Sequence, residues 1–333
     1  MPALQFLTDS PSSLRSCSRH VEQYAEKGAL KPMFRRISTI FIVSALLALL
    51  VAPWSLRAQS AASILSVQWS PQLLRVGSPC LFTVELAQPA TAVKGTWLGH
   101  EIVFTPGASR KVWYALAGVD VEGTPGKQEL ALEVGNAAVV SLKTTRSVEI
   151  LPSTYKTSTL TVPNKFVQPD EATLARVAAE KKIKDEAYAK QIAMAEWQGK
   201  FLPPVRGAIT ETFGTRRVFN GSTASIHRGL DFHARMGTPV TASNSGEIIL
   251  AQPMFYEGGL VVINHGQQFM TQYMHLSKIL VTVGQHVRKG ERIGLSGASG
   301  RVTGPHLHIA VRWQGAYLDP QVLLQLTLPT PAK

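Results

Sequence analysis

The sequence predicts a mostly β protein with two domains joined by an α-helix. Short apolar segments separated by turn residues fill 63–152, an Ala-, Glu- and Lys-rich stretch without Pro or Gly follows, and the chain becomes β-rich and glycine-rich again from residue 201. A chain of 333 residues is also too long for one small domain. We therefore expect a β-sandwich domain over 63–152, a linker with a long helix over 153–200, and a β-domain over 201–333.

Regularly spaced strand candidates predict the first domain. Turn signals, among them Pro-Gly at 106–107 and 125–126, separate apolar segments at a spacing of roughly 8–15 residues. This pattern is typical of a small antiparallel sandwich, and we expect an immunoglobulin-like one. The region has no constellation of titratable residues, so we assign it to spacing or binding. The strand candidates are 63–71, 81–88, 100–107, 111–119, 128–134 and 138–144.

The linker is predicted to contain a helix over 168–198. Pro169-Asp170-Glu171 is a favourable helix start, and Gly199 is a favourable stop. About 28 helical residues would reach roughly 40 Å at 1.5 Å per residue. We interpret this segment as a solvated connecting helix; the alternative is a helix packed against the second domain.

The N-terminus has the features of a secretory signal that begins late. Met33 is followed by Phe34-Arg35-Arg36, an apolar run over 37–52, and then small residues. The run of about 16 residues is shorter than the roughly 20 that a spanning helix needs. We expect a signal peptide over 33–62 and a periplasmic or secreted protein, with a retained inner-membrane signal anchor as the alternative. We interpret residues 1–32 as a non-native or disordered extension and Met33 as the true start.

The net charge and the cysteine content limit the classes of binding partner and the possible disulfides. The net charge of +12 favours polyanionic partners such as cell-wall polymers, membranes or nucleic acid. No basic-aromatic motif accompanies the charge, so we expect no nucleic acid partner, and a membrane partner only if the signal segment is retained. Of the two cysteines, Cys17 precedes the signal. Cys80 would then be alone in the mature chain, unable to form an intramolecular disulfide, and we expect it to be buried in a strand.

Seven of the nine histidines fall between residues 227 and 308, in the second domain. His227 and Asp231 lie four residues apart in HRGLD, His275 lies in YMHLS, and His306 and His308 of GPHLH share one face if the segment is a strand. A catalytic zinc needs three protein ligands and one open position, and a hydrolase also needs groups that manage protons and a developing oxyanion. Five candidates fit a metallohydrolase, although their spacing does not decide which three bind the metal.

HRGLD, YMHLS and GPHLH, in this order, resemble the M23 family of zinc metallopeptidases, of the lysostaphin and LytM type. These enzymes cleave peptide cross-links or bridges of bacterial peptidoglycan. Further segments match over about 205–325, including ITETFGTRR at 209–217 and VTVGQHVRKGERIGLSGASGRVTGPHLHI at 281–309. The resemblance implies a compact, mostly antiparallel β-domain with a zinc groove, and peptidoglycan as the partner.

The resemblance also implies roles for the five candidates. His227, Asp231 and His308 would bind one zinc ion per chain. His275 and His306 would be catalytic, one as general base on the zinc-bound water and the other stabilising the oxyanion or the leaving amine. The three remaining histidines of the domain match no family position. We expect His233 to support the site from behind the ligands, and His265 and His286 to be structural or surface residues.

Two other functions compete with this one. Some members of the family have lost ligands and act as non-catalytic wall-binding or hydrolase-activating proteins, but all five positions are present here. The segment VTVGQHVRKGERIG at 281–294 also resembles the hairpin of biotinyl and lipoyl carrier domains. It lacks their modified lysine, and a carrier would leave the histidines unexplained. The sequence does not decide between a D-alanyl cross-link to a diamino acid and a glycine bridge, and it leaves the oligomeric state open.

Overall fold

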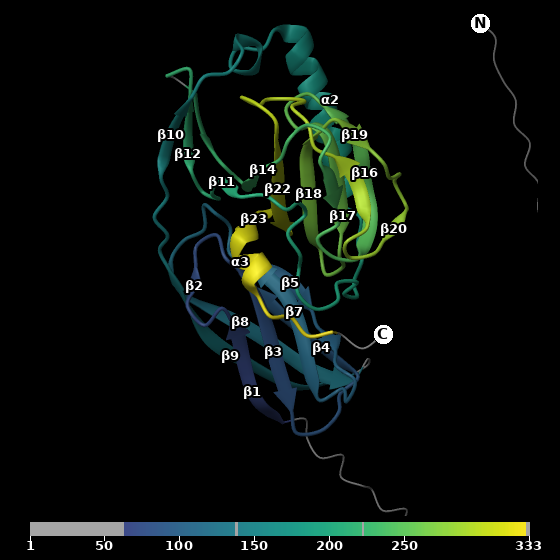
Figure 1. Cartoon of the computed structure of the whole chain (residues 1–333). Coiled ribbons are helices and arrows are strands. Elements are labelled where there is room, and N and C mark those ends of the chain that lie inside the picture. The colour runs from purple at the N-terminus through teal and green to yellow at the C-terminus, as the bar shows by residue number, and fades with distance from the viewer. Residues whose placement is uncertain (1–62, 137–138, 222, 331–333) are drawn as a thin grey trace, which may run out of the picture. The chain divides into compact units, whose positions relative to one another are not determined.

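The computed structural model describes residues 63–136, 139–221 and 223–330 (Figure 1). The described chain is mostly β, as the sequence predicts. The signal peptide expected over 33–62 and the extension expected over 1–32 lie outside the described residues. Within those residues, no helix has the length and apolar character of a membrane span.

Two sheets make up the N-terminal region, and their facing side chains share one core. Phe82 of β3 packs edge-on against Trp97 of β4, with ring centroids 5.2 Å apart. Cys80 is fully buried in β3, as expected. The immunoglobulin-like topology stays a prediction. One sheet orders β1 (Ile64–Ser70), β3 (Pro79–Leu86), β7 (Val112–Gly118) and β6 (Thr105–Pro106), and the other β2 (Leu74–Arg75), β9 (Val139–Leu151), β8 (Gly126–Asn136), β4 (Ala92–Trp97) and β5 (His100–Val103).

Strand β4 is absent from the predicted strands because Gly95 interrupts its apolar pattern. In the structure Gly95 lies where β4 meets β8, and a Cβ at this position would come within 2.5 Å of the Ala131 carbonyl oxygen. A residue that reads as a strand breaker in the sequence therefore permits close pairing of two strands.

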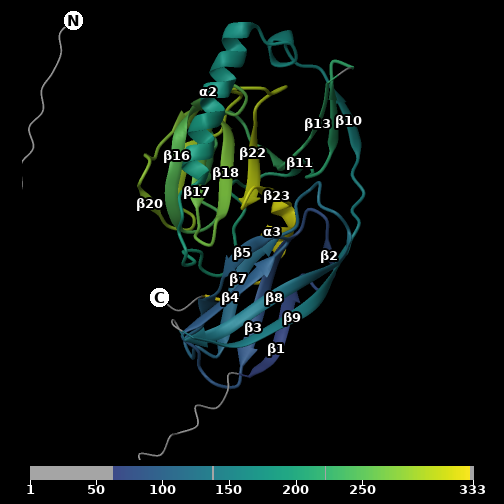
Figure 2. The ribbon, with the colours of Figure 1, turned by 180° about the vertical axis from the view of Figure 1, so that it is seen from behind.

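The helix predicted over 168–198 is wrong in length. Helix α2 spans Glu171–Tyr188, 18 residues, and begins as predicted, with Asp170 accepting the Thr173 N–H at 2.8 Å. It ends before Gly199 because the next residues bond to the second domain: the Ile192 carbonyl accepts the Gln267 N–H at 2.7 Å. The helix combines the two alternatives: most of its residues, Leu174 and Ile183 among them, are exposed, and Glu180 is buried against the second domain. It lies across β16, β17 and β18 (Figure 2), and Glu180 accepts the Phe255 N–H at 2.7 Å.

An antiparallel sheet forms the centre of the C-terminal region. Its order is β11, β14, β22, β18, β17, β16, β20, with β23 beside β22, and two small sheets flank it, β10-β12-β13 and β15-β21-β19. The bounds are β10 (Thr157–Leu160), β11 (Ile209–Glu211), β12 (Arg216–Phe219), β13 (Thr223–Ile226), β14 (Leu230–His233), β15 (Pro239–Thr241), β16 (Gly246–Met254), β17 (Gly258–Asn264), β18 (Phe269–Leu276), β19 (Lys278–Ile279), β20 (His286–Val287), β21 (Arg292–Leu295), β22 (His306–Trp313) and β23 (Ala316–Leu318). The 3-10 helix η1 (Asn164–Phe166) precedes α2, and α3 (Pro320–Gln325) follows β23.

The two regions share a hydrophobic core and a buried polar contact. Trp313 of β22 and Phe269 of β18 belong to the same buried cluster as the core of the N-terminal sheets. The Gln267 side chain donates to the Val103 and Tyr114 carbonyls at 3.0 and 3.1 Å. The N-terminal sheets are therefore packed onto the C-terminal sheet through apolar and hydrogen-bonded contacts.

Candidate metal centre

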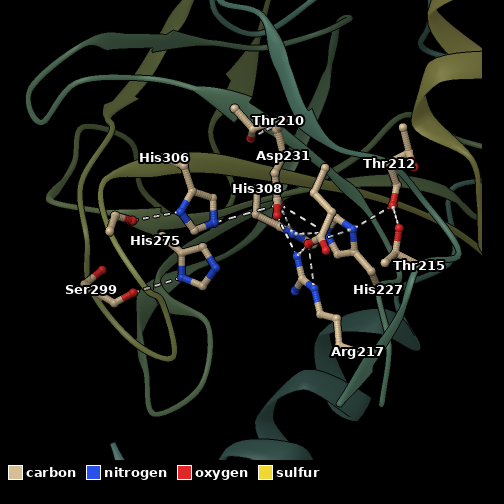
Figure 3. Close-up of polar contacts among 12 residues, drawn as sticks. Thr210, Thr212, Thr215, Arg217, His227, Asp231, His275, Ser299, His306 and His308 are labelled. Atoms are coloured by element: carbon tan, nitrogen blue, oxygen red, sulfur yellow. Dashed lines mark hydrogen bonds and ion pairs between the residues drawn. The ribbon is translucent and has the colours of Figure 1, made fainter. Parts of the chain in front are cut away.

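The pairing of β14 with β22 brings two of the predicted site residues together. Asp231 lies directly opposite His308 in this antiparallel pair, so both side chains project from the same face of the sheet. His306 lies two residues before His308 and projects on that face too, as the alternation of a strand requires (Figure 3). The sheet register thus joins GPHLH to HRGLD across a gap of about 75 residues in the chain.

The chain just before β14 places His227. Its main-chain N–H donates to the Thr215 carbonyl at 2.8 Å, and its own carbonyl accepts the Gly214 N–H at 2.8 Å. The ring Nδ1 donates to the Thr212 carbonyl at 2.9 Å, which leaves the lone pair of Nε2 directed at Asp231. The turn over 212–215 therefore sets both the position and the tautomer of this imidazole.

Three donor atoms converge from these elements. His227 Nε2 lies 3.1 Å from Asp231 Oδ1 and 3.0 Å from His308 Nδ1, and His308 Nδ1 lies 2.7 Å from Asp231 Oδ1. All three residues are buried, and together they could hold a metal ion. A tetrahedral site with bonds of about 2.0–2.2 Å separates its ligand atoms by about 3.3 Å, which is close to this spacing. Two imidazoles and one carboxylate also form a suitable donor set for such an ion.

Gly229 makes this convergence sterically feasible. A Cβ at this position would come within 2.3 Å of His308 Nε2 and 2.5 Å of the Ile309 carbonyl oxygen. Any side chain here would push β22 or the His308 ring away from His227 and Asp231. The glycine of HRGLD thus leaves the space that the imidazole occupies.

Arg217 fixes the second oxygen of the Asp231 carboxylate. Its Nη2 donates to Asp231 Oδ2 at 2.6 Å, while its Nε donates to Glu211 Oε2 at 2.7 Å. Glu211 pairs with Asp231 between β11 and β14, and Arg217 comes from β12. Sequence reasoning missed both residues because Arg217 and Asp231 lie 14 positions apart in the sequence, with no local pattern that connects them. TETFGTRR lay within the matched segments but carried no assigned role.

His275 and His306 lie side by side next to the three donors, with ring centroids 4.9 Å apart. The Nδ1 of His275 donates to the Ser299 carbonyl at 2.9 Å, and the Nδ1 of His306 donates to the Gly304 carbonyl at 2.9 Å. Both rings therefore keep the Nε2 lone pair free, and the Nε2 of His306 lies 3.8 Å from Asp231 Oδ1. His275 has a left-handed backbone, with φ of 63°, which is uncommon for a non-glycine residue and typical of functional sites.

Burial and mutual contacts shift the pKa values in this cluster. Burial lowers the pKa of His308 to about 4. The pKa of His275 falls to about 3, first through burial and then through the charges of His308 and His306. Burial alone would raise the pKa of Asp231, but its contacts with His308 and His227 hold the pKa well below its usual range. At neutral pH the carboxylate is ionised and the two shifted imidazoles are neutral, the forms that bind metals.

Cavities open on both sides of the cluster. One of about 400 Å³ is lined by Asp231, His275 and His306, and another of about 240 Å³ by His227, His275 and His308. We use "the groove" for these two cavities together. A substrate that occupied the groove would therefore pass over all five of the predicted site residues.

The other histidines of the domain have separate environments. His233 is exposed, pairs with His306 across β14 and β22, and lines the larger cavity of the groove rather than supporting the ligands from behind. His265 is buried and bonded to the Ser245 carbonyl and the Thr271 hydroxyl, at 2.7 and 2.8 Å. His286 is an exposed residue 3.3 Å from Glu196. His265 and His286 are thus structural and surface residues, as expected.

A scan against family models matches this part of the chain. Residues 225–320 match peptidase family M23. They form an M23 peptidase domain. All five predicted site residues lie within it, so the resemblance seen in the three histidine motifs is confirmed.

Curated relatives are similar over the same domain. The chain is 56% identical over 101 residues to peptidoglycan DD-endopeptidase ShyA of Vibrio cholerae, which covers 30% of this chain and 24% of that protein. It is 45% identical over 98 residues to an uncharacterized metalloprotease of Haemophilus influenzae, covering 28% of this chain and 20% of that protein. The matched stretches thus span a quarter or less of these relatives.

One solved structure is similar over a larger share of the chain. A Pseudomonas aeruginosa protein described as a peptidase M23 aligns with a TM-score of 0.58 and 27% identity. The alignment covers 76% of this chain and 97% of that one, so it extends well beyond the M23 domain. The fold of the M23 domain together with part of the preceding region therefore recurs in another protein.

Proposed function

We propose that this chain is a zinc-dependent endopeptidase that hydrolyses peptide bonds in peptidoglycan stems or cross-links. One observation carries the proposal: the three buried donor atoms of His227, Asp231 and His308 lie beside the two further imidazoles of His275 and His306, and the groove runs past all of them. The similarity to a peptidoglycan DD-endopeptidase over the same domain supports the substrate class.

His227, Asp231 and His308 would hold the zinc ion through Nε2, Oδ1 and Nδ1. When bound, zinc supplies a Lewis acid that activates water near neutral pH and polarises a carbonyl. The protein orients the ligands before the metal binds, since Thr212 fixes the His227 ring and Arg217 restrains Asp231 through the oxygen that does not face the histidines. Such supporting hydrogen bonds keep the three donors in one arrangement.

His306 is the residue that we propose as general base. Its Nδ1–H is held by the Gly304 carbonyl, so Nε2 is free to accept a proton from the attacking water. The imidazolium formed would lie next to the metal position, 3.8 Å from Asp231 Oδ1. It would then donate this proton to the amine that leaves when the peptide bond breaks.

His275 is the second proposed catalytic residue. Its Nδ1–H is held by the Ser299 carbonyl, so its Nε2 also offers a lone pair to the groove. In this tautomer Nε2 of the ring can accept a hydrogen bond from the water or from the leaving amine. Stabilising an oxyanion would require a proton on Nε2, which the low pKa of His275 disfavours.

A cross-link from D-alanine to a diamino acid is the bond that we propose as substrate, because the named relative is a DD-endopeptidase. Such an enzyme acts on the wall, outside the cytoplasm, and we retain the signal peptide over 33–62 and a periplasmic or secreted location as part of the proposal. The domain division into 63–152, 153–200 and 201–333 also remains a proposal. The non-catalytic alternative has less support, since all five side chains are present and converge.

Digestion of purified peptidoglycan tests the function. The full chain is incubated with peptidoglycan after metal removal and again after zinc is restored, and the masses of the soluble products are measured by mass spectrometry. We expect zinc-dependent conversion of cross-linked dimers into monomers, with one water added for each bond cleaved. If the folded, zinc-loaded chain released no soluble products, the proposed enzymatic function would be refuted and a wall-binding or activating protein would be favoured.

A further inference from the structure

Arg301 is a cation of the groove without a counter-ion. It lines both cavities of the groove: the larger one, which Asp231 and His306 also line, and the smaller one, which His227 and His308 also line. Among the charged residues that line the groove and that the structure describes, Arg301 alone makes no ion pair. Arg217 pairs with Glu211 and Asp231, Arg228 with Glu122, and Glu257 with Lys184.

The fold holds this residue in place without an ion pair. The Arg301 N–H donates to the Tyr256 carbonyl at 2.8 Å. The preceding Gly300 has φ of 79°, and a Cβ there would come within 2.4 Å of the Tyr256 carbonyl oxygen, so the loop before β22 presses against the turn between β16 and β17. The guanidinium carbon lies 4.7 Å from the ring centroid of Phe219 and 4.9 Å from that of Tyr256.

Among the residues that the structure describes, no hydrogen bond uses the side-chain donors of this guanidinium. Aromatic faces stabilise a cation but accept no strong hydrogen bonds, and the five N–H groups of arginine match a carboxylate in a two-pronged arrangement. Arg301 is half-buried, so part of its hydration is already lost. A half-buried, pre-positioned guanidinium next to the reacting groups is suited to an anionic group of the substrate.

We propose that Arg301 binds a carboxylate of the substrate next to the scissile amide, and that the enzyme thereby distinguishes stem peptides with a free carboxylate from amidated ones. This inference rests on the proposed peptidase function and adds the chemical feature that the groove recognises. In a cross-link from D-alanine to a diamino acid, the D-alanine carboxyl forms the scissile amide, and the diamino acid can carry a free carboxylate on the carbon that bears the amide nitrogen. Arg301 acts here as a specificity residue, whereas the proton transfers belong to His275 and His306.

Matched substrates and variants test this. Each carboxylate that flanks the scissile amide of a cross-linked stem peptide is converted in turn to a carboxamide, and kcat/KM is measured on each peptide with the zinc-loaded full chain. Arg301→Met keeps an apolar side chain over the rings of Phe219 and Tyr256 but removes the charge. Arg301→Lys keeps the charge but removes the planar guanidinium that can donate two parallel hydrogen bonds. Arg228→Met is the control, because Arg228 also lines the groove but is paired with Glu122.

We expect the wild type and Arg228→Met to prefer one free carboxylate by about 10-fold or more in kcat/KM. Arg301→Met should cleave the carboxylate and carboxamide forms equally, with the carboxamide form cleaved as fast as by the wild type, and Arg301→Lys should lie between. Zinc content and melting temperature should match the wild type. An unchanged preference in Arg301→Met, or an equal loss on both peptides, would overturn the assignment and leave Arg301 a structural residue.

A binding measurement separates this inference from the proposed function. The same peptides are titrated into the wild type and into Arg301→Met, and the dissociation constants are compared. If the wild type cleaves neither peptide but binds the carboxylate form about 10-fold more tightly, and Arg301→Met does not, the proposed function fails and the Arg301 assignment holds. Equal binding of both forms by the wild type would overturn the Arg301 assignment whether or not the peptides are cleaved.

Discussion

The Nη2 atom of Arg217 lies 2.6 Å from Oδ2 of Asp231, whereas Oδ1 of the same carboxylate faces His227 and His308. The two oxygens thus have different partners, one a fixed cation and the other the candidate metal position. Because the arginine also bonds to Glu211 of β11, the strand that pairs with the strand of Asp231, it cannot easily turn away from Asp231. The carboxylate is therefore held in one orientation.

Arg217→Gln should weaken zinc binding by about 10- to 100-fold, since Asp231 would lose the contact that orients it. The dissociation constant is measured by competition with a chromophoric chelator. Arg216→Gln is the control, because Arg216 is exposed on the same strand. An unchanged zinc affinity in Arg217→Gln would show that Asp231 needs no support from the arginine.

His308→Ala and His306→Ala should separate metal binding from proton transfer. His308→Ala is expected to lose zinc and activity together, whereas His306→Ala should keep zinc and lose about 100-fold or more in kcat, as removal of a general base does. Zinc content is measured by atomic absorption on the folded proteins, with His286→Ala as the surface control. A folded His306→Ala protein without zinc would mean that the roles of the two histidines are assigned wrongly.

Gly229→Ala should reduce both stability and zinc binding. The added methyl group would overlap His308 Nε2 and the Ile309 carbonyl, and relieving such an overlap costs about 1–3 kcal/mol. Urea unfolding with and without zinc gives the free energies. Gly304→Ala is a suitable control, since no atom lies within 4 Å of a Cβ built there. Equal stabilities for the two variants would contradict the packing argument.

His265 should make the fold less stable in acid. Burial lowers its pKa from the ordinary 6.5 to about 4. As the pH falls below 6.5 the unfolded chain takes up this proton before the folded one does, so the free energy of unfolding decreases until the pH reaches about 4. The full effect of this one residue is about 3 kcal/mol.

Urea unfolding of the wild type and of His265→Gln at pH 7 and pH 4 measures this contribution. We expect the wild type to lose up to about 3 kcal/mol more than the variant over this range. His286→Gln is the control, because His286 is exposed. Equal losses for the wild type and His265→Gln would show that His265 does not stay neutral in the fold.

Gln267→Ala should destabilise the whole described unit. The Gln267 side chain bonds to Val103, Thr105, Tyr114 and Leu116 of the N-terminal sheets, and its removal would leave several buried groups unpaired. Each such group costs about 1–3 kcal/mol, so a loss of about 3 kcal/mol or more is expected. Thermal unfolding measures it.

Gln268→Ala is the matched control for this contact. Both residues have a left-handed backbone, with φ of 54° and 58°, but Gln268 bonds only to the exposed segment around Lys190. If both variants lost the same stability, the backbone change rather than the contact with the N-terminal sheets would be responsible.

Much of the site was predictable because its residues occur in short local motifs. The alternation of a strand was enough to place His306 and His308 on one face, the histidine clusters added His227, Asp231 and His275, and the family resemblance assigned their roles. The supporting residues could not be predicted in this way. Arg217 of β12 contacts Asp231 of β14 although the two strands belong to different sheets, and Arg301 is recognisable as an unpaired cation only when its neighbours are known.

The sequence by itself determined the mostly β class, the start of α2 at Asp170 and the set of five candidate residues, because these depend on local periodicity, helix capping and motif composition. The tertiary structure decided where α2 ends and against what it packs, since hydrogen bonds from Asn264 and Gln267 hold the chain at Lys190 and Ile192 in a non-helical path. It also decided how the five residues meet, because the register of β14 with β22 is a long-range pairing that sequence spacing does not encode.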